Sequence, residues 1–280
     1  MSQIEDNFFD VEGSTLNQSL STEYTVTGLV RGQDYGFRYR AINANGGGVW
    51  SAITYITAAT IPSAPANAPE YVSSTNTQIV LKLSRSYDDG GAAIADYELE
   101  IDQGFPPTAL ITSGISTFTK VTQYVYSTHW FSYTIDSTTL SLTPGKLYRF
   151  RYRSKNKMGY SPYSDTQRIG LGALPSAVSG LSRRAEVAGE VAWNSNTTIG
   201  LSWTAVTGDT LPIKEYVIYM SDQLQATMSE IYRGTFTYTK IENLVPGATY
   251  NFKVSAINFN GEGALSSAIA KRSCVAPSGV

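Results

Sequence analysis

The sequence predicts an all-β fold built from tandem antiparallel β-sandwiches. Apolar and polar residues alternate with a period of two, Gly, Pro, Asn and Asp separate short strand-like runs, and one pattern recurs along the chain. The composition agrees, because 12% of the 280 residues are aromatic and only 16% are charged, and aromatic side chains pack well on a pleated sheet. No segment keeps a helical period over three turns.

An internal repeat defines the organisation of the chain. Three segments share one pattern: LVRGQDYGFRYRAINANGGG (29–48), LTPGKLYRFRYRSKNKMGYS (142–161) and LVPGATYNFKVSAINFNGEG (244–263). Their common anchors are a Tyr, an Asn and a later Gly, namely Tyr35, Tyr148, Tyr250, Asn43, Asn156, Asn258, Gly46, Gly159 and Gly261. Pro-Ser pairs at 62–63, 175–176 and 277–278 recur with the same spacings of 113 and 102 residues. Two markers with shared spacings establish the repeat.

Strand patterns lie inside each repeat. Residues 148–153 alternate Tyr or Phe with Arg, which places the rings on one face and the guanidinium groups on the other. Residues 97–102 alternate apolar residues with carboxylates, and residues 199–203 place Ile, Leu and Trp on one face. Short strands of this kind at this spacing predict an antiparallel sandwich.

The run Leu-x-Pro-Gly-x-x-Tyr, followed by alternating apolar positions and Asn-x-x-Gly, resembles the E–F corner, F strand and F–G turn of a fibronectin type III domain. The resemblance implies a tyrosine corner, whose ring is buried and whose hydroxyl bonds to upstream backbone. Trp203 is similar to the buried strand-B tryptophan of that family, and Tyr97 and Tyr216 to its strand-C tyrosine. Leu83 occupies the tryptophan position of the middle unit, and Arg31 replaces the corner proline of the first.

This frame divides the chain into modules. Residues 1–61 form a partial module with strands C to G, 62–174 a complete module with an insertion, 175–276 a second complete module, and 277–280 the start of a further one. Met1 falls where strand C should begin, so either the chain is an excerpt of a longer array or neighbouring copies complete one another's sandwich. A sandwich that lacks two strands exposes unpaired edges, so we favour the excerpt.

The insertion of the middle module amounts to 17 residues, because Tyr97 and Tyr148 are 51 positions apart, whereas Tyr216 and Tyr250 are 34 apart. Its Tyr, Val, Thr and Trp content favours strands. We expect residues 119–135 to form added or lengthened edge strands, with Trp130 or Tyr126 packed against a neighbouring module or copy.

The residues offer little catalytic chemistry, and we predict no enzyme, cofactor or metal site. His129 is the only histidine, so neither a Ser-His-Asp triad with a spare base nor a multi-histidine zinc site can form. Asp88 and Asp89 could suggest a cation site, but carboxylates beside Gly are more typical of a turn. The glycine clusters do not open a helix after a strand, so they predict no nucleotide site.

The arginine stripe formed by Arg149, Arg151 and Arg153 has two interpretations. It could bind heparin or nucleic acid, or it could pair internally. Strands C and F are neighbours in the fold that the resemblance implies, and the carboxylates of residues 98–102 would then face the stripe. We therefore favour internal pairing, at about 0.2–1 kcal/mol for each pair. The net charge of −2 also gives no general attraction to nucleic acid.

Two sequons are candidate glycosylation sites, at Asn17 and Asn196. Low charge and abundant Ser and Thr favour a protein that faces an exterior and carries glycans. Cys274 is the only cysteine, which is consistent with a reducing compartment or with an extracellular fold that needs no disulfide. No apolar run of about 18 residues is present to span a membrane.

We expect a structural or adhesive role: a repeat segment of an extracellular fibre, surface coat or adhesin that acts through protein–protein contacts. Its partners would be copies of itself, joined head-to-tail into a filament, with covalent glycans as possible additions. One alternative is an intracellular cytoskeletal or ciliary scaffold, and another is an accessory module of a carbohydrate-active enzyme. Fold alone does not choose among these roles.

Overall fold

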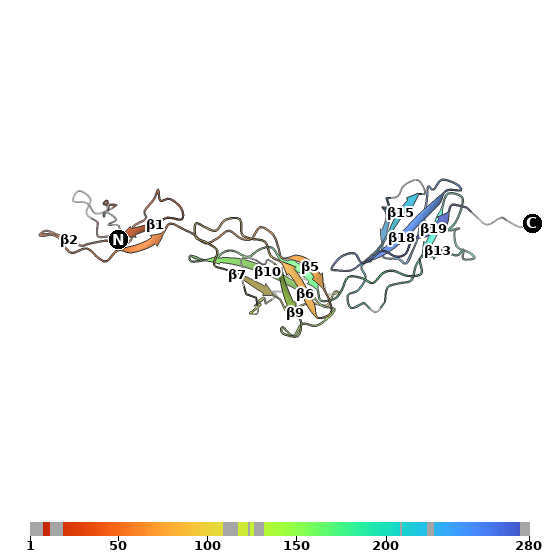
Figure 1. The fold of residues 1–280 in the computed structure, drawn as a ribbon, viewed down its shortest axis with the longest axis horizontal. Coiled ribbons are helices and arrows are strands. Elements are labelled where there is room, and N and C mark those ends of the chain that lie inside the picture. Colours follow the sequence, from red (N-terminus) through yellow and green to blue (C-terminus); the bar gives the residue numbers. More distant parts are fainter. Residues whose placement is uncertain are drawn as a thin grey trace, which may run out of the picture. The chain divides into compact units, whose positions relative to one another are not determined.

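The computed structural model describes residues 8–11, 19–108, 117–122, 124–125, 132–207, 209–222 and 227–274 (Figure 1). The described residues contain strands and no helix, so they include no helix that could cross a membrane. They form two compact units. The first comprises Met1–Ser63, Ser86–Asp96 and Ser154–Ser161, and the second comprises Ala64–Arg85, Tyr97–Arg153 and Pro162–Val280. The predicted all-β fold is confirmed.

The first unit contains two small strand pairs. Strand β1 (Asp34–Phe37) pairs with β4 (Thr54–Thr57), and β2 (Ile42–Asn43) forms a hairpin with β3 (Gly46–Gly47). These elements correspond to the F and G strands and their turn.

Further strands of the partial module were expected, but the described residues 8–11 and 19–33 contain none. Apolar side chains in that segment, such as Leu20 and Tyr24, are exposed, so no burial offsets the entropy of ordering a strand there. The predicted start of strand C at Met1 lies outside the described residues.

The middle sandwich has two antiparallel sheets. One has the order β5 (Glu70–Ser74), β6 (Gln78–Lys82) and β9 (Ser132–Asp136). The other has the order β11 (Gly159–Tyr160), β10 (Leu147–Asn156), β7 (Asp96–Ile101) and β8 (Thr119–Lys120), and β12 (Gln167–Gly170) also pairs with β10. Strand β7 corresponds to strand C, and β10 corresponds to strand F, so this order places strand C beside strand F.

The third sandwich repeats the plan. Strands β13 (Ser182–Arg183), β14 (Ile199–Ser202) and β17 (Tyr238–Ile241) form one sheet. Strands β16 (Ser229–Gly234), β15 (Glu215–Asp222), β18 (Thr249–Ile257) and β19 (Ile269–Arg272) form the other. The alternation seen in the sequence puts one face of each strand into the core between the sheets.

The predicted core residues are buried. Tyr97, Tyr148, Trp203, Tyr216 and Tyr250 are each at most 7% exposed. In the third module Trp203 packs edge-on against Tyr216, with ring centroids 5.7 Å apart. These burials confirm the prediction for both complete modules.

The insertion of the middle module differs from expectation in its described part. The edge strand β8 has two residues, whereas its counterpart β16 in the third module has six, so the edge strand is shortened rather than lengthened. Strand β9 occupies the place of β17, because β9 pairs with β6 as β17 pairs with β14. Short edge strands that carry a charged side chain resist pairing with the edges of other chains. Strand β8 is of this kind, because it has two residues and one of them is Lys120. Tyr126, His129 and Trp130 lie outside the described residues.

Candidate functional site: the module junctions and the charged sheet face

Each F strand is anchored at its start by a tyrosine corner. The hydroxyl of Tyr148 accepts a hydrogen bond from the backbone N–H of Thr143 at 2.6 Å, and that of Tyr250 accepts from Val245 at 2.9 Å. The Tyr35 hydroxyl accepts from the fifth residue upstream in the same way, at 2.8 Å. The corner predicted from the repeat is therefore present three times.

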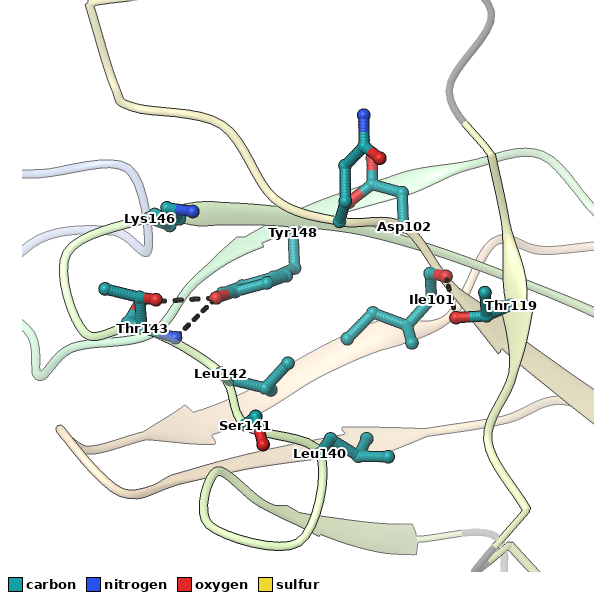
Figure 2. A pocket seen from close by; sticks show the side chains of 10 residues that line it. Ile101, Asp102, Thr119, Leu140, Ser141, Leu142, Thr143, Lys146 and Tyr148 are labelled. Atoms are coloured by element: carbon teal, nitrogen blue, oxygen red, sulfur yellow. Dashed lines mark hydrogen bonds between the residues drawn. The ribbon is translucent and has the colours of Figure 1, made fainter.

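The hollow beside the tyrosine corner of the middle sandwich does not assemble reactive groups. A pocket of about 250 Å³ lies beside the corner of the middle sandwich, and Figure 2 shows the hydroxyl of Tyr148 directed at Thr143 there. Asp102 is its one carboxylate, and Asp102 is bound to Arg149. The described residues also contain no group of three or more His, Cys, Asp or Glu that could hold a metal ion. Asp88 and Asp89 accept bonds from the N–H groups of the glycines two residues later, as turn residues do.

The F–G turn at the end of each F strand has one repeated geometry. The Oδ1 atoms of Asn43, Asn156 and Asn258 accept hydrogen bonds from the N–H two residues later, at 2.9, 2.8 and 2.8 Å. The glycine that follows adopts φ of 120°, 137° and 138° at Gly46, Gly159 and Gly261, a region that disfavours other residues. This turn leaves the Nδ2 group of each Asn available as a donor.

At the first junction that donor binds the linker that precedes the middle module. Nδ2 of Asn156 donates to the carbonyl of Thr60 at 2.8 Å and to that of Asp89 at 2.7 Å. The N–H of Thr60 donates to the carbonyl of Gly90 at 2.8 Å. A Cβ at Gly90 would lie 2.3 Å from the Thr60 oxygen, so only glycine permits this approach. The linker is therefore bound from two loops.

The second junction repeats the contact and adds to it. Nδ2 of Asn258 donates to the carbonyl of Ala173 at 2.8 Å, which lies two residues before the linker proline, as Thr60 does. Nδ2 of Asn260 donates to the carbonyls of Gly170 and Gly172 at 2.9 and 2.7 Å. The N–H of Gly170 donates back to Oδ1 of Asn260 at 2.7 Å. We call this arrangement of turn amides on linker backbone the linker clamp.

Apolar packing and further hydrogen bonds complete the second junction. Leu211 is 1% exposed. A Cβ atom at Gly170 would lie 2.7 Å from both methyl groups of Leu211, and a Cβ atom at Gly172 would lie 2.8 Å from its Cγ. The hydroxyl of Ser74 donates to the Gly170 carbonyl at 2.9 Å, and that of Thr210 donates to Oδ1 of Asn76 at 2.6 Å. The junction thus buries a leucine that no strand pattern of the sequence identifies.

The arginine stripe of β10 pairs with carboxylates that lie in β7 and directly after its end. Arg149 binds Asp102 at 2.7 Å, and the next two pairs, Arg151–Glu100 and Arg153–Glu98, measure 2.7 and 2.5 Å. Internal pairing, predicted from the neighbouring strands, is confirmed.

Aromatic rings flank the same stripe. The guanidinium of Arg151 lies 4.1 Å from the ring centroid of Phe118 and 3.8 Å from that of Tyr163. Burial and a hydrogen bond from its hydroxyl to Glu100 raise the pKa of Tyr163 to about 12. The ladder of rings, guanidinium groups and carboxylates therefore satisfies its own charges and does not form a free basic surface.

The third module has a cluster that the sequence analysis did not anticipate. Fifteen residues separate β13 from β14, whereas three separate β5 from β6. Within that longer loop Trp193 packs edge-on against Tyr238 at 5.5 Å, and Arg184 lies 4.4 Å from both rings. The only signal in the sequence was the length of the loop.

The structure describes one of the two candidate sequons. Asn196 is exposed and lies in the loop immediately before β14, at the exposed strand entry that was expected. Asn17 lies outside the described residues.

Comparison with known proteins identifies the family of the third module. Residues 190–272 match the family model of the fibronectin type III domain. The chain is 24% identical over 267 residues to Fibronectin type-III domain-containing protein 3a of Gallus gallus, which covers 95% of this chain and 20% of that protein. It is 28% identical over 256 residues to Fibronectin type-III domain-containing protein 3A of Mus musculus, covering 86% and 18%. The chain thus spans about a fifth of the length of these curated relatives.

Among solved structures, the chicken CNTN1 FN1-FN3 domains match at 20% identity with a TM-score of 0.42, covering 88% of this chain and 77% of that one. A two-domain fibronectin type III segment from chicken tenascin matches at 18% identity with a TM-score of 0.32, covering 74% and 98%. The family match, the related sequences and the twice-repeated sandwich agree. Residues 190–272 are thus a fibronectin type III domain, and the chain as a whole is similar to fibronectin type III domain-containing proteins.

Proposed function

We propose that the chain is a structural and adhesive segment that acts through protein–protein contacts, as a repeat of an extracellular fibre, surface coat or adhesin. Proteins with fibronectin type III domains generally mediate protein–protein interactions. The observation that carries the proposal is the linker clamp, which binds linker backbone at both junctions. A chain that only tethered its modules would not need this, because free linkers serve that purpose.

The clamp supports a mechanical role for a physical reason. A flexible linker lets each module reorient at little cost, whereas hydrogen bonds to the linker backbone must break before a junction can open. Four hydrogen bonds between Asn258 or Asn260 and the linker, together with buried Leu211, oppose opening at the second junction.

The exterior setting is supported by the surface. Asn196 is an exposed sequon, and we propose that it carries a glycan when the protein enters a secretory pathway, with Asn17 as a second acceptor. Mass spectrometry of the peptide that contains Asn196, from secreted protein, tests this directly. Unmodified Asn196 in an intact, exported chain would contradict its role as a glycan acceptor.

The test of the clamp is limited proteolysis of the full chain at residues 170–176. Asn258→Ala combined with Asn260→Ala should accelerate cleavage of this linker by at least about tenfold, because the junction loses four hydrogen bonds worth on the order of 1 kcal/mol each. Asn251→Ala, on the F strand of the same module, serves as the matched control and should leave the rate unchanged. Equal cleavage of the double variant and the parent chain would contradict the proposal.

A further inference from the structure

Aromatic rings lie on the outer face of the smaller sheet of the third module. The core residue Leu201 follows Gly200 in β14, so Gly200 faces outward. Trp193 covers Gly200 from that side, because a Cβ atom added to the glycine would lie 2.8 Å from the Cβ of Trp193. Tyr238 of β17 lies beside Trp193, and Phe236 lies beside Tyr238, with ring centroids 5.5 and 5.6 Å apart. We call these three rings the aromatic row.

Polar neighbours hold the ring of Trp193 in one orientation. Its Nε1–H donates to Oε2 of Glu190 at 2.9 Å, and the same oxygen accepts from Nη2 of Arg184 at 3.3 Å. The guanidinium of Arg184 lies 4.4 Å from the ring centroids of both Trp193 and Tyr238. A side chain that is already ordered loses little further entropy when a ligand packs on it.

Part of the aromatic row is exposed to solvent. Phe236 and Tyr238 are 62% and 36% exposed, and Trp193 is half-buried. The face of an aromatic ring carries partial negative charge and attracts C–H groups, which carry partial positive charge. A pyranose sugar presents several C–H groups on one face and its hydroxyls at the edge. It can therefore bury apolar surface on an aromatic face while its hydroxyls stay in water.

The sequon at Asn196 lies next to the aromatic row. The N–H of Ser195 donates to the carbonyl of Thr198 at 3.0 Å, so residues 195–198 form a tight turn with the exposed Asn196 at its tip. The hydroxyl of Thr198 donates to the carbonyl of Trp193 at 3.4 Å, which ties the turn to the tryptophan. Trp193 precedes Asn196 by three residues, so their Cα atoms are at most about 11 Å apart. A sugar on Nδ2 of Asn196 therefore starts within reach of the row.

We propose that the aromatic row binds the inner sugars of a glycan on Asn196: the first N-acetylglucosamine packs on the ring of Trp193, and the next sugar lies over Tyr238. This rests on the proposed function, in which Asn196 is the glycan acceptor, and deepens it by naming the protein surface that holds the glycan. The contact buries apolar ring surface only in the folded module, so the glycan stabilises that module.

The experiment is a double-mutant cycle on the full chain, secreted from cultured cells by means of an added signal peptide. It compares the parent, Asn196→Gln, Trp193→Leu and the double variant, so the packing that Trp193→Leu loses in the protein itself cancels. Hydrogen exchange of the amides of β18, read by mass spectrometry, reports the opening of the third module. Asn196→Gln should lower their protection about fivefold in the parent, and by less than about 1.5-fold in the Trp193→Leu background.

Two further backgrounds show whether the coupling belongs to the ring of Trp193. Trp193→Phe keeps an aromatic face, so Asn196→Gln should still lower the protection at least about twofold there. Tyr219→Leu removes a half-buried ring from the other sheet of the same module and should leave the fivefold effect unchanged.

The occupancy of Asn196, measured by mass spectrometry on the same samples, separates the possible failures. A glycan on Asn196 whose removal has equal effects in the parent and in the Trp193→Leu background overturns this inference and leaves the proposed glycan in place. Secreted chain without a glycan on Asn196 overturns both.

Discussion

The middle and third modules share a core but differ on the outer face of their larger sheet, the face that points away from the core between the sheets. In the middle module three arginines of β10 bind Glu98 and Glu100 of β7 and Asp102, which directly follows that strand. The same register positions in the third module hold the pairs Val217–Ser255, Tyr219–Lys253 and Ser221–Asn251. Ionic pairing across this face is therefore a property of one module and not a requirement of the fold.

The cores show the opposite behaviour. The tyrosine corner has nearly the same geometry at Tyr148 and Tyr250, while Leu83 and Trp203 fill one position with different shapes and are 2% and 6% exposed. A hydrogen-bonded corner must keep its chemistry, whereas an apolar position needs only to be filled. The comparison predicts which substitutions each module tolerates.

The largest effect is expected from the core. Trp203→Ala should lower the free energy of unfolding of the third module by about 3–5 kcal/mol, because it leaves a cavity beside Tyr216. Urea denaturation followed by circular dichroism measures the loss. Phe236→Ala, on a side chain that is 62% exposed, is the control and should change stability by less than about 0.5 kcal/mol. Similar losses in both variants would show that the core comparison is wrong.

A smaller effect is expected from the charged face. Asp102→Asn should destabilise the middle module by about 3 kcal/mol, because Asp102 is fully buried and its loss leaves the guanidinium of Arg149, 18% exposed, without a carboxylate. Ser221→Ala at the matching position of the third module should cost less than about 1 kcal/mol. Chemical denaturation of both variants gives the comparison, which fails if the two losses are equal.

The smallest effect is a pH dependence confined to the middle module. Burial raises the pKa of Glu98, but hydrogen bonds from Arg153 and Lys120 outweigh it and leave the pKa below the ordinary value of 4.5. A lowered pKa in the folded state means that Glu98 stabilises the module above about pH 4.5 and loses that contribution as the pH falls through the folded pKa.

Thermal unfolding between pH 3 and pH 7 measures this dependence. Glu98→Gln should reduce the acid sensitivity of the middle module and leave that of the third unchanged, since Val217 stands at the matching position. An unaltered pH profile in the variant would remove Glu98 from the explanation.

The sequence by itself determined the sandwiches, the tyrosine corners and the ion pairs between β7 and β10. Each depends on a pattern that is local in the chain: a period of two fixes which face a side chain occupies, and the repeat fixes which strands are equivalent. The resemblance to a fibronectin type III domain implies that strands C and F are neighbours, and the alternation then places Arg149 and Asp102 on the same face. The same resemblance matches Leu83 with Trp203, and both are buried.

Only the tertiary structure decided how the linkers are bound. The Asn258 amide binds a carbonyl 85 positions away, and a backbone carbonyl has no residue type that a sequence pattern could reveal. The burial of Leu211, the packing of Trp193 on Tyr238 and the shortening of β8 likewise depend on which loops meet. Strand patterns report the face on which a side chain lies, whereas loop contacts depend on the path of the backbone between strands, which no local period specifies.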